Sequence, residues 1–236
     1  MSGDGQRHRA IRSFVRREGR ITEAQKRALE ELLPCYGIDA GEAPLDFVAL
    51  FGSDAPVHLE IGFGNGEALV AMAAAHPQYN YLGIEVHRPG VGVLLRRIEA
   101  EGLANVRVAC TDAKELLERR IPENSLSAVY VFFPDPWHKK RHHKRRLVQA
   151  EFVALLARKL KPGGLLHLAT DWEDYAQHML AVLAADATFE NTAQPGPFTT
   201  RPEDRTLTRF ERRGRRLGHG VRDLVFRRCR SAATTG

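Results

Sequence analysis

The most informative stretch of the chain is VHLEIGFGNGEALVAMAAAH, residues 57–76. Its apolar first part predicts a buried strand, its glycines predict a tight turn, and its alanine-rich second part predicts a helix. The same order of strand and helix recurs further along. Additional strands are predicted at 80–86, 105–110, 127–133, 165–170 and 223–229, and additional helices at 91–102, 113–120, 146–160 and 175–185. The alternation predicts an α/β fold, Rossmann-like and doubly wound, with a mostly parallel sheet and helices on both faces.

The region before this stretch has a different pattern. Residues 20–33 read as a short amphipathic helix, which Thr22 can cap together with Gln25 three positions later. The Pro, Gly and Asp residues at 34–56 predict a loop or linker. We therefore divide the chain into a basic N-terminal segment with a helix, residues 1–56, and a Rossmann-like domain with a C-terminal segment, residues 57–236.

Charge is distributed unevenly along the 236 residues. Residues 1–27 carry a net +5, residues 139–146 a net +6 and residues 201–236 a net +7. Since the whole chain carries +6, the rest of it must carry −12. Basic ends can be solubilising tails, or the three segments can converge into one surface for a polyanion such as nucleic acid. Composition alone leaves both explanations open.

Several classes of protein are disfavoured by the composition. No run of about 18 apolar residues predicts a transmembrane helix, and the polar, Arg-rich N-terminus is unlike a secretory signal. Cys35, Cys110 and Cys229 fit neither a disulfide framework nor a zinc spacing. We expect a cytoplasmic protein with no membrane partner and no bound metal. No coiled coil or apolar edge strand stands out, which favours a monomer.

The glycine turn predicts a ligand site at the end of the first strand. Gly62 and Gly64 let a ligand approach the backbone, because no Cβ intervenes. A dinucleotide fingerprint would place a third glycine at the position of Glu67, whose carboxylate would repel a pyrophosphate. The turn therefore favours a nucleoside ligand without phosphates.

This Glu60-x-Gly62-x-Gly64-x-Gly66 turn resembles motif I of the Rossmann-like S-adenosylmethionine methyltransferases. The resemblance implies that Glu60 lies near the methionine end of the cofactor. It further implies that Glu85, which ends the second predicted strand, binds the ribose hydroxyls and that Asp112, after the third, accepts from the adenine amino group. The alternative is that Glu85 and Asp112 are only helix N-caps or acids of a first helical turn.

A second informative stretch follows the fourth predicted strand. It reads Phe133-Pro134-Asp135-Pro136-Trp137 and continues as HKKRHHKRR, residues 138–146. The two prolines restrict the backbone on either side of Asp135, so we expect this side chain to point into the cleft beside the glycine turn. The basic run is either a solvated face or a loop that brings phosphates to the cleft. Its three histidines are unsuited to a metal, since no acid or Cys lies among the six cations.

The same stretch is similar to the signature of the bacterial tRNA (guanine-N7-)-methyltransferases. Five other segments carry the same resemblance: RSFVR at 12–16, LGIEVH at 82–87, ATDW at 169–172, TRFERRG at 208–214 and LGHGV at 217–221. One position departs from the pattern, because Arg209 stands where Lys is expected between Thr208 and Phe210. Charge is kept there, although Arg and Lys differ in geometry.

The resemblance implies methyl transfer from S-adenosylmethionine to N7 of a guanosine in the variable loop of tRNA. Asp135 is then the central catalytic residue, in contact with both cofactor and base. The implied substrate-binding residues are Lys139, Asp171, Thr208, Arg209, Phe210 and Glu211. The implied RNA-binding residues are Arg141, His142, His143, Lys144, Arg145 and Arg146.

Three structural alternatives stay open on sequence alone. Asp171 and Trp172 can be a helix cap and a packed aromatic, and Thr208–Glu211 can be a surface turn. Trp137 either stacks on a base or anchors its loop. For the whole chain, the alternatives are an RNA-binding protein on a catalytically inactive methyltransferase fold and, less well supported by the basic segments, a methyltransferase for proteins or small metabolites.

Overall fold

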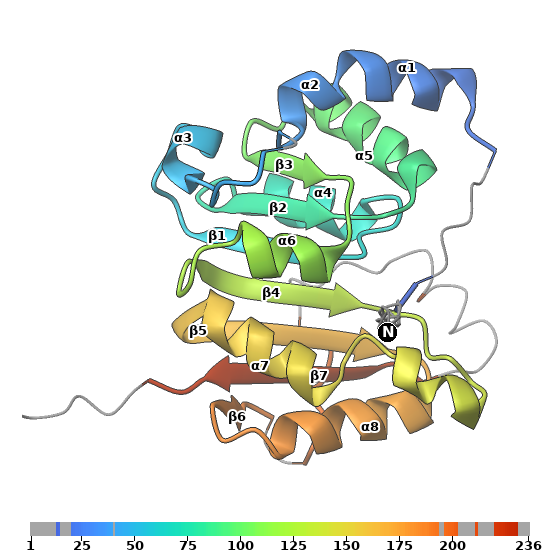
Figure 1. Cartoon of the computed structure of the whole chain (residues 1–236), viewed down its shortest axis with the longest axis vertical. Coiled ribbons are helices and arrows are strands. Elements are labelled where there is room, and N and C mark those ends of the chain that lie inside the picture. The colour runs from blue at the N-terminus through green and yellow to red at the C-terminus, as the bar shows by residue number, and fades with distance from the viewer. Residues whose placement is uncertain are drawn as a thin grey trace, which may run out of the picture.

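The chain forms one seven-stranded sheet with the strand order β3-β2-β1-β4-β5-β7-β6 (Figure 1). The computed structural model describes residues 13–14, 20–39, 41–193, 196–202, 211 and 220–230. The strands are β1 Val57–Ile61, β2 Asn80–Ile84, β3 Val106–Ala109, β4 Leu126–Phe132, β5 Leu160–Thr170, β6 Phe189–Asn191 and β7 Arg222–Arg228. The pairs among β1 to β5 are parallel, whereas β7 runs antiparallel to both β5 and β6. The predicted mostly parallel sheet is confirmed.

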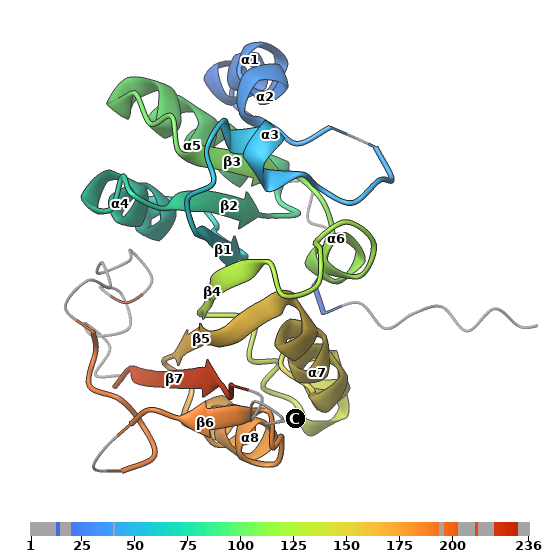
Figure 2. The ribbon, with the colours of Figure 1, turned by 90° about the vertical axis from the view of Figure 1, so that its left-hand side faces the viewer.

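Helices cover both faces of this sheet (Figure 2). One apolar cluster joins the sheet to α4 Glu67–Ala75 and α5 Arg88–Glu101. The other joins it to α6 Ala113–Arg119, α7 Ala150–Lys159 and α8 Glu173–Ala184. The strands are buried on both sides, which explains their nearly continuous apolar sequences. Within the described ranges, no helix combines the length and the apolar character that crossing a bilayer requires.

The N-terminal region packs on the same sheet domain. Its first helix, α1 Glu23–Glu31, has the predicted capping box between Thr22 and Gln25. Ala28 and Leu29 of α1 are buried in the cluster formed with α4 and α5. The approach is close at Gly92 of α5, where a Cβ would lie 2.8 Å from the carbonyl oxygen of Gln25.

The predicted loop at 34–56 is wrong in two places, because α2 Leu33–Tyr36 and α3 Phe47–Phe51 lie there. Pro34 is tolerated in α2 since it occupies the first turn, where its missing N–H costs nothing. Asp46 caps α3 by accepting from the N–H of Ala49 at 3.1 Å. Gly52 ends α3 in the left-handed conformation. Asp and Gly residues here cap helix ends. The same residue types are common in loops, so their presence in the sequence does not distinguish a capped short helix from a loop.

Other elements also differ from the prediction. α5 begins at Arg88 instead of 91, β5 begins at Leu160 instead of 165, and β6 Phe189–Asn191 is not predicted. The helix predicted at 146–160 begins only at Ala150. The basic run before it forms a short 3-10 helix, η1 Lys140–Arg145, instead of a loop. A dense row of cations gives no periodic apolar signal, so the sequence pattern cannot indicate this helix.

Candidate active site

A cavity opens at the carboxyl ends of β1, β2, β3 and β4. Each strand contributes one residue singled out by the sequence: Gly62, Glu85, Asp112 and Asp135. The edge lies where β1 has β2 on one side and β4 on the other, so the chain reverses its direction of winding there. Ligands of open parallel sheets bind at such a point. The structure therefore brings these four predicted site residues to one place.

The glycine turn presents its backbone to this cavity. Gly62 and Gly64 have φ values of 75° and 58°, in the left-handed region that favours glycine. A Cβ built on either residue would meet no atom within 4 Å among the residues that the structure describes. The glycines thus leave open space beside the backbone, as a ligand would require.

The carboxylate of Glu85 accepts three backbone hydrogen bonds. It receives the N–H of Gly64 at 2.9 Å, of Val86 at 2.7 Å and of His87 at 3.0 Å. A carboxylate has about four acceptor sites, so one remains for a ligand hydroxyl. Asp112 caps α6 by accepting from the N–H of Lys114 at 2.8 Å, and it lines the cavity as well. Asp112 is therefore a helix cap that also lines the cavity, whereas Glu85 caps no helix, because the N-cap of α5 is His87 and α5 has no side-chain capping bond.

Glu60 lies beneath the glycine turn and is only 3% exposed. Its Oε2 atom is buried and has no hydrogen-bond partner among the described residues. Burial, with a smaller contribution from the nearby Glu85 carboxylate, raises the pKa of Glu60 to about 8. An unpaired buried acid is costly, and a cationic group brought into the cavity would lower that cost.

The turn after β4 holds Asp135 at the cavity in a strained backbone. Phe133 and Trp137, on either side of it, have φ values of 51° and 49°. Non-glycine residues in this region cost about 1–3 kcal/mol each, and such strain is found at functional sites. The turn is attached to the sheet by the Phe133 N–H, which donates to Ala169 O at 2.8 Å. Asp135 itself is exposed to the cavity.

Trp137 anchors this turn. Its indole N–H donates to the carbonyl oxygen of Ser13 at 3.1 Å. The guanidinium of Arg145 lies over its ring, 3.9 Å from the centroid, and donates to Phe14 O at 3.4 Å. Ser13 and Phe14 themselves line the cavity. Sequence reasoning missed these two residues, since nothing in their types indicates a ligand site.

The six predicted RNA-binding residues differ in exposure. Arg141 and Lys144 are exposed on η1, while His142, His143 and Arg145 are half-buried. Partial desolvation and the cations around it, Arg141 first, hold the pKa of His142 below its usual value, so its ring is neutral at pH 7. Arg146 stands apart, because its side chain is 2% exposed and pairs with the carboxylate of Asp174. It has no surface to offer a phosphate.

The predicted substrate-binding residues are only partly brought together. Lys139 is exposed immediately before η1. Asp171 follows β5, whose end lies beside that of β4, but it lines a separate shallow depression with Trp172, Asp174 and Arg222. Thr208, Arg209 and Phe210 lie outside the described residues, and Glu211 is fully buried.

Comparison with known proteins identifies the family. A family model described as "Putative methyltransferase" matches residues 54–224. The tRNA (guanine-N(7)-)-methyltransferase of Aeromonas hydrophila subsp. hydrophila is 58% identical over 225 residues, 95% of each chain. The protein of the same name from Hydrogenovibrio crunogenus is 57% identical over 220 residues, 93% of this chain and 92% of its own. The chain belongs to the tRNA (guanine-N(7)-)-methyltransferase family.

Solved structures support the fold of this family member. The 16S rRNA methyltransferase KamB has a TM-score of 0.54 at 17% identity, covering 78% of this chain and 92% of its own. A 16S rRNA (adenine(1408)-N(1))-methyltransferase from Catenulisporales acidiphilia, solved with its cosubstrate SAM, also scores 0.54 at 18% identity, covering 81% and 95%. These likenesses confirm a class I methyltransferase fold.

The cofactor of the family, S-adenosylmethionine, fits this cavity. It carries a sulfonium and an ammonium group but no phosphate, which suits the acids Glu85 and Asp112 in the cavity lining. Glu60 is not itself a lining residue, but it lies directly before Ile61 and Gly62, which are. The buried, unpaired Oε2 of Glu60 and the open backbone at Gly62 and Gly64 are the observations that support the fit. Among the described residues, no group of three or more His, Cys, Asp or Glu side chains is arranged to hold a metal ion.

Proposed function

We propose that this chain transfers the methyl group of S-adenosylmethionine to N7 of a variable-loop guanosine in tRNA. The observation that carries the proposal is the position of Asp135. It lines the acidic cofactor cavity and lies four residues before the exposed cations of the basic run. A polyanionic substrate held by those cations would present its reacting base at this carboxylate. The names of the relatives support the same substrate.

The chemistry asks for positioning more than for proton transfer. Guanine N7 has a free lone pair, so no base must remove a proton before it attacks. S-adenosylmethionine, when bound, would supply an electrophilic methyl group: formation of the N7–CH₃ bond would break the S–CH₃ bond, leave a neutral thioether and place the positive charge on the guanine. The protein's task is to hold N7 in line with that methyl group, and accurate orientation can account for a large part of the rate enhancement.

Carboxylates are suitable groups for orienting the guanine. Its Watson–Crick edge presents two donors, N1–H and the 2-amino group, once the base has left its stack. We propose that Asp135 accepts from this edge inside the cavity and that Asp171, at the neighbouring strand end, assists it. Thr208, Arg209 and Phe210 would contact the substrate from the C-terminal segment, with the buried Glu211 supporting them.

The phosphates would be bound by the exposed cations around η1. We define the η1 surface as Lys139, Lys140, Arg141 and Lys144, all of which are exposed. His142, His143 and Arg145 flank it, and Arg145 also donates to the carbonyl oxygen of Phe14. Arg146 is buried, so it cannot contact a phosphate and does not belong to this surface, contrary to the prediction from the sequence. The basic ends of the chain would extend this surface. A tRNA substrate implies action in the cytoplasm, where we expect the protein to act as a monomer.

The test is to locate the methyl group. The protein is incubated with labelled S-adenosylmethionine and an unmodified tRNA transcript, and the RNA is cleaved chemically at N7-methylguanosine. Scission at one variable-loop guanosine is the expected result. Label on another atom would contradict the proposed reaction, and tRNA binding without any transfer would favour an RNA-binding protein on an inactive fold.

A further inference from the structure

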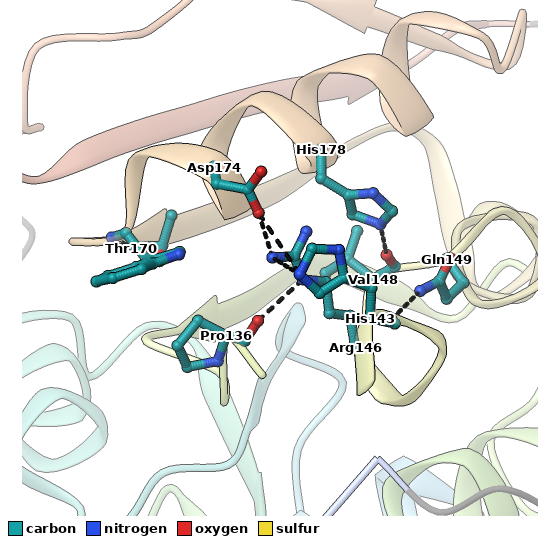
Figure 3. Close-up of polar contacts among 9 residues, drawn as sticks. Pro136, His143, Arg146, Val148, Gln149, Thr170, Asp174 and His178 are labelled. Atoms are coloured by element: carbon teal, nitrogen blue, oxygen red, sulfur yellow. Dashed lines mark hydrogen bonds and ion pairs between the residues drawn. The ribbon is translucent and has the colours of Figure 1, made fainter. Parts of the chain in front are cut away.

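Arg146 is buried and contacts Pro136, His143 and Asp174 (Figure 3). Its Nε–H donates to the carbonyl oxygen of Pro136 at 2.9 Å. One terminal nitrogen bonds the carboxylate of Asp174 and lies 3.1 Å from Nε2 of His143. The guanidinium also lies over the ring of Tyr175, 4.8 Å from its centroid. The side chain is thus held on several sides.

These contacts connect the two turns that carry the proposed base-binding acids. Pro136 is the residue directly after Asp135, at the end of β4. Asp174 is in the first turn of α8, three residues after Asp171 at the end of β5. A second contact spans the same gap, because the ring of His138 meets that of Trp172 edge-on, 4.2 Å between centroids. Arg146 therefore bridges the Asp135 turn and the Asp171 turn.

The chemistry of the bridge depends on the shape of the guanidinium. Its planar group directs the Nε–H and a terminal N–H to two acceptors on different elements at once, which the single ammonium of Lys cannot reproduce. The hydrogen bond from Arg146 holds the pKa of the Asp174 carboxyl below its usual value, so Asp174 is ionised at neutral pH. The bridge is then a charge-assisted hydrogen bond, stronger than a neutral one.

We infer that Arg146 is a positioning residue, which fixes the Asp135 turn against the start of α8 and so sets the spacing between Asp135 and Asp171. The roles of those two acids rest on the proposed function. Arg146 itself does not line the cavity. A displacement of about 1 Å at a reacting centre can reduce the rate about 100-fold. Loss of the bridge should therefore slow the chemical step more than it weakens binding.

The test compares Arg146→Lys, Asp174→Ala and their double variant with Arg158→Lys. Arg158 is an exposed arginine of α7, paired with Glu123 at 3.8 Å, and serves as the matched control. We expect Arg146→Lys and Asp174→Ala each to lower kcat on tRNA about 10- to 100-fold. The KM for tRNA and the Kd for S-adenosylmethionine should change less than about threefold, and the double variant should be no worse than the poorer single one, as expected for groups that act as a unit.

A phosphate contact at Arg146 would give the opposite pattern. Arg146→Lys would then retain its kcat, and Asp174→Ala would tighten tRNA binding because it removes a negative charge. Either result would overturn the inference, as would additive losses in the double variant. Asp174→Asn, which keeps an acceptor oxygen, should recover part of the kcat lost in Asp174→Ala; no recovery would count against the bridge.

A second measurement does not depend on turnover. Asp174 is 62% exposed, so Asp174→Ala, which removes the acceptor altogether, should leave the fold intact even if Arg146→Lys unfolds. Hydrogen exchange of the Phe133 amide, which donates to Ala169 O at 2.8 Å, should be faster in that variant than in Arg158→Lys, and equal exchange would overturn the inference. If the wild-type protein failed to methylate tRNA, the proposed function would fall, while the exchange experiment would still decide whether the bridge holds the turn.

Discussion

The N–H of Gly64 donates to the carboxylate of Glu85 at 2.9 Å, which joins the glycine turn after β1 to the end of β2. The bond holds the acid in place before any ligand arrives, so the ribose-binding group is already oriented. Preorganisation of this kind reduces the entropy lost on binding. The Glu85 side of the cavity is therefore oriented by backbone-to-carboxylate bonds at the sheet edge.

Glu85→Gln should weaken cofactor binding. Three backbone N–H groups donate to the carboxylate of Glu85. The amide of Gln keeps one acceptor oxygen, but its NH₂ group would face at least one of these N–H donors and could not accept from it. We expect the Kd for S-adenosylmethionine to rise about 10- to 100-fold, since hydrogen bonds to charged groups contribute about 1.5–3 kcal/mol. Calorimetric titration measures the Kd. Glu118→Gln, at an exposed position of α6, is the control, and an unchanged affinity in Glu85→Gln would exclude the proposed role.

Glu60 should make the stability of the ligand-free protein depend on pH. Its pKa is 4.5 in an ordinary environment and about 8 in the folded protein, so the folded state keeps a proton that the unfolded state releases between these values. The free energy of unfolding should therefore fall as the pH rises through this window. The side chain of Glu60→Gln cannot ionise, so the free energy of unfolding of this variant should not show this fall with pH. Its Tm relative to the wild type should increase from pH 5 to pH 8, and a constant difference would contradict the raised pKa.

The same residue should couple cofactor binding to proton release. A cation near Glu60 favours the carboxylate, so a protonated Glu60 should lose its proton when S-adenosylmethionine binds. Calorimetric titration of the protein with S-adenosylmethionine at pH 7, repeated in buffers of different ionisation enthalpy, measures the protons released on binding. We expect release of a fraction of a proton from the wild type and none from Glu60→Gln. Release that persists in the variant would assign the proton to another group.

Asp135→Ala should abolish methyl transfer while the fold survives. The side chain is exposed to the cavity and packs into neither apolar cluster, so the Tm should change by little. Loss of base orientation should reduce kcat by at least about 100-fold. Transfer is measured by single-turnover incorporation of label into tRNA. Near-normal rates would show that Asp135 is not the residue that orients the base.

The sequence predicts the sheet and most of the cavity because both depend on local signals. A strand followed by glycines or an acid places Gly62, Glu85 and Asp112 at one edge of any parallel sheet. Arg146 shows where such reasoning ends. Within a run of six cations nothing distinguishes the buried one, because its burial depends on Asp174, 28 residues further along. Ser13 and Phe14 are likewise brought to the cavity by tertiary contacts with Trp137 and Arg145.

Trp137 could not be assigned from sequence, and its contacts now predict how it responds to mutation. Trp137→Phe removes the N–H that donates to Ser13 O but keeps a ring beneath Arg145. One hydrogen bond contributes about 0.5–1.5 kcal/mol, so the Kd for S-adenosylmethionine should rise about 2- to 10-fold if Ser13 and Phe14 help to close the cavity. Trp137→Ala should cost more, since it also removes the ring beneath the guanidinium. Equal affinities in wild type and both variants would show that the anchored segment does not cover the cofactor.

The η1 surface should control how tRNA binding depends on salt. Replacing Lys140, Arg141 and Lys144 together by Ala removes three exposed cations, each of which would neutralise about one phosphate. The logarithm of the tRNA-binding constant falls linearly with the logarithm of the salt concentration. The steepness of this fall should decrease by about 1 for each phosphate that is no longer neutralised. The matched control replaces Arg119, Arg158 and Lys161, three exposed cations away from η1, by Ala. Both variants lower the net charge by three, so a decrease confined to the first would locate the phosphate-binding cations on η1. An equal decrease in both would instead reflect net charge alone.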